Sequence, residues 1–124
     1  MNTLLLGKWG EAVAAEYLRK KKYAIIDAGY RTRYGELDLV AENKTHLVFV
    51  EVKLRKNADH GYAAEAVTKI KQRKIIGTAK FWARNKKIKK YIRFDVIEVY
   101  APEGISENYT INHIEGAFVD ETTY

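Results

Sequence analysis

Cysteine is absent from this chain of 124 residues, and proline and methionine occur once each. Without cysteine there are no disulfides and no thiolate metal ligands, a composition typical of proteins of the reducing cytoplasm. Long apolar runs are also missing. The N-terminal segment MNTLLLGKWG has only three consecutive leucines, too few for a signal peptide or a membrane span. We therefore expect a cytoplasmic protein with no membrane segment.

The rest of the composition is that of an ordinary globular protein, with 47 % hydrophobic and 31 % charged residues and no internal repeat. A chain of this length can bury one contiguous core. The sequence therefore predicts a single domain over residues 1–124, without a linker.

Positive charge is missing from the C-terminal part of the chain. All 22 Lys and Arg residues lie at or before Arg93 together with 9 of the 16 acidic residues, so the first 93 residues carry a net charge of +13 and the last 31 carry −7. A basic body attracts the phosphates of a nucleic acid or an anionic membrane surface. The clusters at 19–22 and 86–90 also suit the C-terminal ends of helices. We interpret the charge as favouring a nucleic-acid partner.

The apolar periodicity and the turn residues predict seven elements in the order α-β-β-β-α-β-β. We expect an α/β fold in which a mixed central sheet of about five strands is flanked by helices. The stretch from Lys56 to Gly61 reads as a mobile loop. The expected elements are a helix over 3–22, strands over 23–31, 36–42 and 46–55, a helix capped by Thr68 and ending near Asn85, and strands over 91–100 and 109–118.

Charged residues interrupt two of these strands. In the third strand Glu51 and Lys53 follow an apolar run, and in the second strand Asp38 alternates with leucines. A two- or four-residue turn around Asn43 would pair residues whose numbers sum to 87, placing Glu36 opposite Glu51 and all these charges on one face. A three-residue loop would separate the two sets unless a bulge restored the parity.

Carboxylates gathered on one face repel one another unless a cation joins them. Mg²⁺ suits such a site because it favours oxygen ligands and keeps positions for water and substrate phosphate. Lys53 could then orient or deprotonate an attacking water. The same spacing is also that of a cross-strand salt bridge between Lys53 and Glu51 or Glu36, and ionic networks of this kind often mimic active sites.

These residues resemble a known signature. Asp38 followed by Glu51-Val52-Lys53 is similar to the D…(D/E)XK pattern of the PD-(D/E)XK nuclease superfamily, in a form closest to archaeal Holliday junction resolvases. Five blocks in order resemble the bacterial YraN family over nearly the whole chain. The blocks are GKWGEAVAAEYL, YRTRYGELDLVA, LVFVEVKLR, EAVTKIKQRKI and RFDVIEV.

The resemblance implies a restriction-endonuclease-like core and a Mg²⁺- or Mn²⁺-dependent endonuclease for branched or structured DNA. It gives catalytic roles to Asp38, Glu51, Lys53 and Glu11. Metal binding falls to Asp38, Glu51 and Glu11, because in the resolvases a glutamate of the first helix completes the metal site. Glu36 is an accessory carboxylate. The resemblance to the resolvases also implies a homodimer. The apolar and acidic C-terminal segment 109–124, which lacks Lys and Arg, is our candidate for the contact, but it can equally complete the sheet within one chain.

Two departures from the superfamily pattern are visible. Leu37 replaces its proline, and no tyrosine follows Gln72 by four residues, which argues against the related exonuclease branch. Basic residues that flank the Glu51 strand and enter the second helix predict a DNA-binding surface beside the metal site. The basic residues are Arg55, Lys56, Lys69, Lys71, Arg73 and Lys74, and Gln72 lies among them.

Two other functions fit the same sequence. One is a non-catalytic nucleic-acid-binding module that retains the nuclease fold. The other is an accessory protein whose basic face docks an acidic partner. Divalent-metal binding separates the first interpretation from these two, because only the nuclease requires it.

Overall fold

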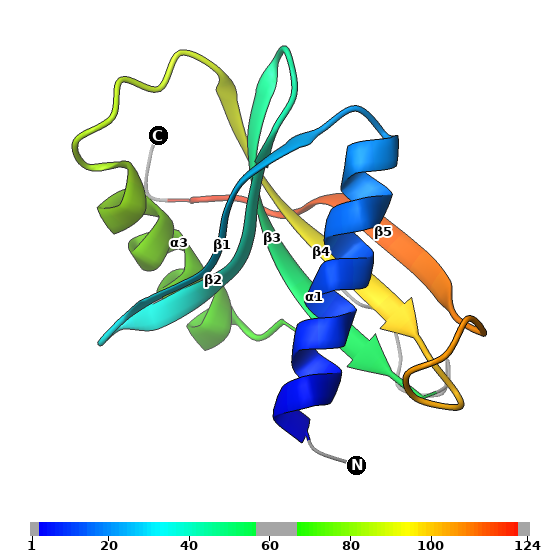
Figure 1. The fold of residues 1–124 in the computed structure, drawn as a ribbon. Coiled ribbons are helices and arrows are strands. Elements are labelled where there is room, and N and C mark those ends of the chain that lie inside the picture. The colour runs from blue at the N-terminus through cyan, green and yellow to red at the C-terminus, as the bar shows by residue number, and fades with distance from the viewer. Residues whose placement is uncertain (1–2, 57–66, 122–124) are drawn as a thin grey trace.

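The computed structural model describes residues 3–56 and 67–121, which form two helices and five strands in the predicted order (Figure 1). The predicted mobile loop, residues 56–61, lies outside the described residues except for Lys56. The elements are α1 (Thr3–Lys20), β1 (Ala24–Thr32), β2 (Gly35–Glu42), β3 (His46–Arg55), α3 (Lys69–Ala83), β4 (Tyr91–Tyr100) and β5 (Thr110–Phe118).

The five strands form one mixed sheet in the order β1-β2-β3-β4-β5. Neighbouring strands are antiparallel except β3 and β4, which run parallel. A parallel pair needs a crossover connection, and the segment containing α3 supplies it. The predicted mixed sheet flanked by helices is thus confirmed.

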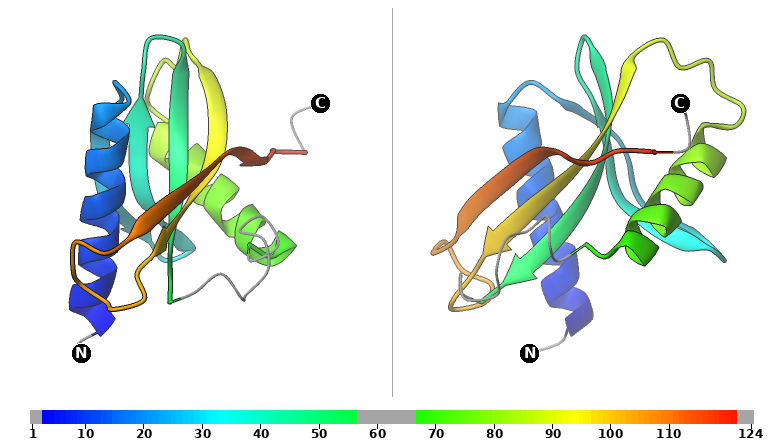
Figure 2. Two further views of the ribbon diagram at one scale, coloured as in Figure 1. Left: turned by 90° about the vertical axis from the view of Figure 1, so that its right-hand side faces the viewer. Right: turned by 180° about the vertical axis from the view of Figure 1, so that it is seen from behind.

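The two helices cover opposite faces of the sheet (Figure 2). On the α1 face the core includes Ala14, Leu18, Leu39, Val48 and Ile97. On the α3 face a second core includes Val40, Phe49, Ile76, Trp82 and Val96. Side chains of β3 therefore alternate between two buried layers, as the period of a strand requires.

Each helix packs against the sheet beside a glycine, and only Gly35 leaves no room for a Cβ. A Cβ built on Gly10 of α1 would lie 3.5 Å from Leu54 Cδ1, and one built on Gly35 of β2 would lie 2.9 Å from Thr78 Oγ1 of α3. These contacts fix α1 against the C-terminal half of β3 and α3 against the start of β2. The candidate site lies between these two contacts.

The helix ends follow their sequence signals with small differences. The Thr68 side chain accepts a hydrogen bond from Lys71 N, which confirms the predicted N-cap of α3. α1 ends at Lys20 rather than at 22, because Lys22 adopts a positive φ of 73° and Tyr23 N bonds Leu18 O in a Schellman arrangement. No helix of the described residues is long and apolar enough to cross a membrane.

The turn between β2 and β3 corrects the predicted register. Leu39 pairs with Val50 and Glu42 with Leu47, so paired residue numbers sum to 89 and not to 87. The cause is Asn43, whose side-chain oxygen accepts hydrogen bonds from the backbone amides of Thr45 and His46. Asn43 therefore opens the turn instead of occupying its centre. The parity of the pairing is unchanged, but Leu37 packs in the same core as Val40, so β2 does not alternate regularly through Asp38.

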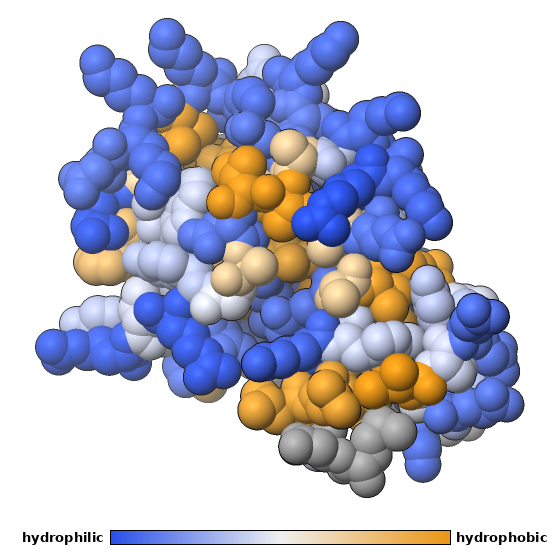
Figure 3. Space-filling view, viewed as in Figure 1, coloured by the Kyte–Doolittle hydropathy of each residue, from blue (hydrophilic) through white to orange (hydrophobic). Residues whose placement is uncertain are grey.

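Ile70, on the first turn of α3, is 66 % exposed and lies outside the core. Hydrophilic side chains surround the end of the molecule where α1 ends and the β2–β3 turn lies (Figures 1 and 3). Hydrophobic side chains are visible toward the middle of the same view.

A buried polar network fastens α1 and β5 to β4. Arg93 donates two hydrogen bonds to the fully buried Asp95, at 2.8 and 2.9 Å, and one to Tyr23 Oη. His113 Nε2 lies 2.7 Å from Asp95 Oδ2, while its Nδ1 lies 3.1 Å from Tyr17 Oη. Every charge in the network has a partner, which explains how Asp95 is tolerated in the core. Asp95 thus supports the sheet, away from the candidate site.

Candidate active site

The strands β2 and β3 separate at the position where the charged residues begin. Their last ladder pair is Leu39 with Val50, and beyond it the Asp38 carboxylate accepts a hydrogen bond of 2.8 Å from Val52 N. Asp38 and Glu51 are the first residues beyond this last pair, one on each strand. Both carboxylates are buried, with 8 % and 7 % exposure of the residue. In the predicted register, Asp38 would instead lie opposite Phe49 and diagonal to Glu51.

Burial and the neighbouring acids change the chemistry of Asp38. Desolvation, followed by the charge of Glu51, raises the pKa of Asp38 from 3.8 to about 7, and the hydrogen bond from Val52 opposes this only in part. Glu11 and Glu36 act in the same direction. Three neighbouring carboxylates therefore raise the pKa of the Asp38 carboxyl, and a cation bound beside these four acids would be strongly favoured.

Two lysines converge on Glu51. Lys71 Nζ of α3 lies 2.7 Å from Glu51 Oε1, and Lys53 Nζ lies 3.7 Å from the same oxygen. The salt bridge between Lys53 and Glu51 that the sequence left open is thus present. Burial and the adjacent Lys71 lower the pKa of Lys53. The pKa of Lys71 is raised, because its bonds to Glu51 and Lys53 outweigh its own burial.

A groove of about 500 Å³ lies beside Asp38, between α1 and the β1–β2 hairpin. Burial, followed by the charge of Glu36, raises the pKa of Glu11, whose carboxylate belongs to this groove. Glu36 is paired with Arg31, with 2.8 Å between Nε and Oε2. The lining residues are Thr3, Leu4, Gly7, Lys8, Glu11, Gly29, Arg31, Glu36 and Asp38.

The residues present fit a hard divalent cation. Asp38, Glu51 and Glu11 supply carboxylate oxygens, the ligands that Mg²⁺ and Mn²⁺ prefer. The pKa values of Asp38 and Glu11 are raised first by burial and then by neighbouring carboxylates, so a cation beside them would stabilise their ionised forms. Within the described ranges no three Asp, Glu or His side chains converge as a preformed metal cluster, and the ammonium of Lys71 contacts Glu51 instead.

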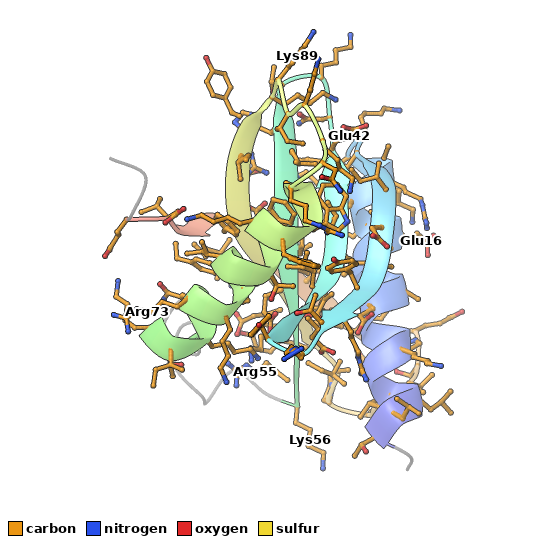
Figure 4. All side chains as sticks on the ribbon, turned by 90° about the vertical axis from the view of Figure 1, so that its left-hand side faces the viewer. Glu16, Glu42, Arg55, Lys56, Arg73 and Lys89 are labelled. Carbon is orange, nitrogen blue, oxygen red and sulfur yellow. The ribbon has the colours of Figure 1, made fainter. Side chains whose placement is uncertain are left out.

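The predicted DNA-binding residues occupy different environments. Lys56, Arg73 and Lys74 are exposed at the end of the molecule that carries the site, where Figure 4 labels the first two. Arg55 is largely buried, with a side chain that is 18 % exposed and 3.3 Å from the buried carboxylate of Glu98. Three residues have other contacts, since Lys69 pairs with Glu121, Gln72 Nε2 donates to Val67 O, and Lys71 pairs with Glu51.

Comparison with known proteins assigns the chain to a family. A model described as "Uncharacterised protein family UPF0102" matches residues 10–99, a segment that contains Glu11, Asp38, Glu51 and Lys53. The chain belongs to the UPF0102 family. This agrees with the YraN resemblance of its sequence blocks.

UPF0102 relatives match nearly the full chain. A UPF0102 protein of Syntrophotalea carbinolica is 44 % identical over 116 residues, which cover 93 % of this chain and 92 % of that protein. A UPF0102 protein of Clostridioides difficile is 43 % identical over 119 residues, covering 95 % of this chain and the whole of that protein. A UPF0102 protein of Caldanaerobacter subterraneus is 42 % identical over 120 residues, with coverage of 95 % and 98 %.

Sequence reasoning missed two side chains around the site of this UPF0102 protein, Lys8 and Arg31, which line the groove. Lys71 was predicted only as a phosphate contact, and its contact with Glu51 was missed. One signal was available for Lys71, since it lies three residues after the N-cap Thr68, on the first turn of α3.

Proposed function

We propose that this protein is a cytoplasmic, metal-dependent endonuclease that hydrolyses phosphodiester bonds in branched or structured DNA. The observation that supports the proposal most is the placement of Asp38, Glu51 and Lys53 at the separation of β2 and β3, beside an open groove. The resemblance to the PD-(D/E)XK nucleases and the archaeal resolvases supplies the reaction class. Membership of the UPF0102 family by itself supplies no activity.

Asp38, Glu51 and Glu11 would hold the metal ion, Mg²⁺ or Mn²⁺. When bound, the ion supplies stabilisation of charge on the scissile phosphate and lowers the pKa of its water. Asp38 is oriented for this task by Val52 N, and Glu36 contributes negative charge from the groove. Lys71 offsets the charge of Glu51 and restrains its carboxylate.

Lys53 is the residue of the site best suited to handle the proton of the attacking water. Burial and the nearby Lys71 lower its pKa, which brings the neutral amine closer to the working pH. Its side chain is 23 % exposed, so substrate and water can reach it. The groove cations Lys8 and Arg31 can receive the phosphates that flank the bond.

Replacing Lys53 by alanine tests this proposal. The cleavage rate of a four-way DNA junction in Mg²⁺ should fall by ~10²–10⁴-fold, the usual contribution of a general acid or base, with little change in DNA affinity. Lys56→Ala is the matched control, because it removes one exposed cation nearby and should lower affinity and not turnover. Equal losses of rate and affinity in Lys53→Ala would contradict the proposed role.

A non-catalytic nucleic-acid-binding module is the second candidate function. One observation favours it, since Lys71 and Lys53 already surround Glu51 and offset its charge without a metal. Under this interpretation DNA affinity would be independent of divalent ions and no cleavage would be measured. The same junction assay, run with and without Mg²⁺, therefore separates the two candidates.

A further inference from the structure

A second concentration of positive charge lies at the end of the molecule opposite the candidate site. It comes from three segments that are far apart in sequence: the last two residues of α1 with those that follow it, the β2–β3 turn, and the connection from α3 to β4. Together they hold ten of the 22 cationic residues of the chain. We call them the far-end cluster: Arg19, Lys20, Lys21, Lys22, Lys44, Arg84, Lys86, Lys87, Lys89 and Lys90.

The sheet brings these segments together. Ala24, two residues after Lys22, pairs with Glu42, and Tyr91 N donates to Thr45 O at 3.0 Å. Lys90 Nζ lies 3.1 Å from Glu42 Oε2. Figure 4 shows Lys89 and Glu42 at one end of the molecule and Arg55 and Lys56 towards the other. The cluster is therefore a feature of the tertiary structure and not of one run of lysines.

The charge of the far-end cluster is mostly not neutralised. Glu42 is the one acidic residue in the segments 19–23, 42–46 and 84–91, and Lys20 pairs with Glu16. Among the described residues, no carboxylate lies within 4.0 Å of five exposed cations of the cluster, Arg19, Lys22, Lys44, Lys87 and Lys89. The C-terminal ends of α1 and α3 supply only about half a negative charge each. Helix capping therefore does not explain ten cations.

The cluster is too distant to act on a ligand at the candidate site through its field. Glu51 lies five residues along β3 from His46, roughly 16 Å at the usual rise of a strand, and Arg55 lies roughly 30 Å from it. Both separations exceed the Debye length of about 8 Å at physiological ionic strength. A ligand of the far-end cluster must therefore contact it directly.

We propose that the far-end cluster binds the sugar–phosphate backbone of a nucleic-acid segment other than the one in the candidate site. This inference rests on the proposed function for the identity of the partner, since a branched DNA offers a second arm. Tyr91, 75 % exposed beside His46, places a ring among the cations, with 5.6 Å between the two ring centres. Cations combined with an exposed aromatic ring are typical of nucleic-acid surfaces.

The shape of the cluster also suits extended phosphate binding. A hollow of about 400 Å³ lies between the α3–β4 connection and the sheet, where it is lined by residues of β1, β2 and β3. Four of its nine lining residues are lysines of the far-end cluster, and the others include Glu42, Trp82 and Ile26. Lys86 is held in place by a 2.7 Å hydrogen bond to Trp82 O, while Lys87 and Lys89 remain available.

The test compares two triple variants that each remove three exposed positive charges. K44Q/K87Q/K89Q changes the far-end cluster, and K56Q/R73Q/K74Q changes the surface at the site. The affinity for a four-way DNA junction is measured against salt concentration in EDTA, so that nothing is cleaved. Each variant should lower the slope of log K against log salt by about 2.7, at about 0.9 for each lost phosphate contact. Combining the variants should add the two losses, because the surfaces are well separated.

An unchanged slope for K44Q/K87Q/K89Q, with the expected loss for K56Q/R73Q/K74Q, would overturn the inference. So would loss of binding to phosphatidylserine vesicles in K44Q/K87Q/K89Q with DNA binding unchanged, since the cluster would then serve a membrane surface. Failure of the proposed function is a different result. If both triple variants show their slope losses but the wild-type protein cleaves no junction DNA in Mg²⁺, the nuclease proposal ends and this inference stands.

Discussion

At the scale of single residues, Asp38 is a buried carboxyl group whose pKa departs far from its value in water. Its pKa is raised from 3.8 to about 7, first by burial and then by Glu51. The folded protein therefore holds a proton on Asp38 more tightly than the unfolded chain does. The resulting stabilisation is complete below about pH 4 and is lost as the pH rises through 7, where the buried carboxylate ionises.

Asp38→Asn should therefore stabilise the metal-free protein at high pH. In EDTA at pH 8 the free energy of unfolding should rise by up to about 4 kcal/mol, the equivalent of about three pKa units, while at pH 4 the difference should be small. Urea denaturation at both pH values measures this. Glu103→Gln, which changes an exposed acid in the β4–β5 connection, is the control. A variant equally destabilised at both pH values would show that Asp38 serves mainly as the partner of Val52 N.

Alternation along β3 was enough to predict that Glu51 and Lys53 share one face, where the Glu51 carboxylate meets both Lys53 and Lys71 of α3. The roles of the site residues stay predictions. The pairing of Lys71 with Glu51 could not be predicted, because it depends on how α3 crosses the sheet and not on local spacing. Arg55 illustrates the same limit, since its buried partner Glu98 lies 43 residues away.

At the scale of elements, the sequence predicted the order and the ends of the strands to within about a residue, because strand periods and turn residues are local signals. The register of β2 with β3 was wrong by one residue on each strand. That register depends on the side chain of Asn43, which bonds the amides of Thr45 and His46. The hydrogen bonds of one side chain, Asn43, thus set the register that brings Asp38 beside Glu51 and not opposite Phe49.

The contact between α3 and β2 can be tested at Gly35. An alanine Cβ there would lie 2.9 Å from Thr78 Oγ1, and Thr78 is held by its bond to Lys74 O, so the neighbour cannot move freely. Gly35→Ala should lower the free energy of unfolding by about 1–3 kcal/mol, the usual cost of overpacking. The midpoint of urea denaturation reports this change.

Gly77→Ala provides the matched control on the same helix. Nothing lies within 4 Å of a Cβ at Gly77, so the substitution should gain about 0.5–1 kcal/mol from the higher helix propensity of alanine. A Gly35→Ala protein as stable as the wild type would mean that α3 does not approach β2 as closely as the structure shows.

At the scale of the whole molecule, the resemblance to the resolvases leads us to expect a homodimer with two equivalent sites. β5 lies at the edge of the sheet and pairs with β4 alone among the described strands. Its sequence and the residues after it contain no Lys or Arg, so this edge is poorly suited to DNA and is our candidate for the dimer contact.

Light scattering over a range of protein concentrations, with and without junction DNA, should give twice the mass of 14.3 kDa. The increase should not require DNA, because an edge-strand contact is made by the protein itself. A monomer under every condition would exclude symmetric cutting of two strands by one assembly. A nicking enzyme or a binding module would then be the better explanation.

The central claim is that the acids between β2 and β3 form a metal site, and calorimetric titration of Mg²⁺ tests it most directly. The wild-type protein should bind the ion in the presence of DNA, and Asp38→Asn should abolish or greatly weaken that binding. Glu103→Gln should bind as the wild type does, since it leaves the site intact. Absence of divalent-ion binding to the wild-type protein, with DNA present, would contradict the claim and the catalytic function built on it.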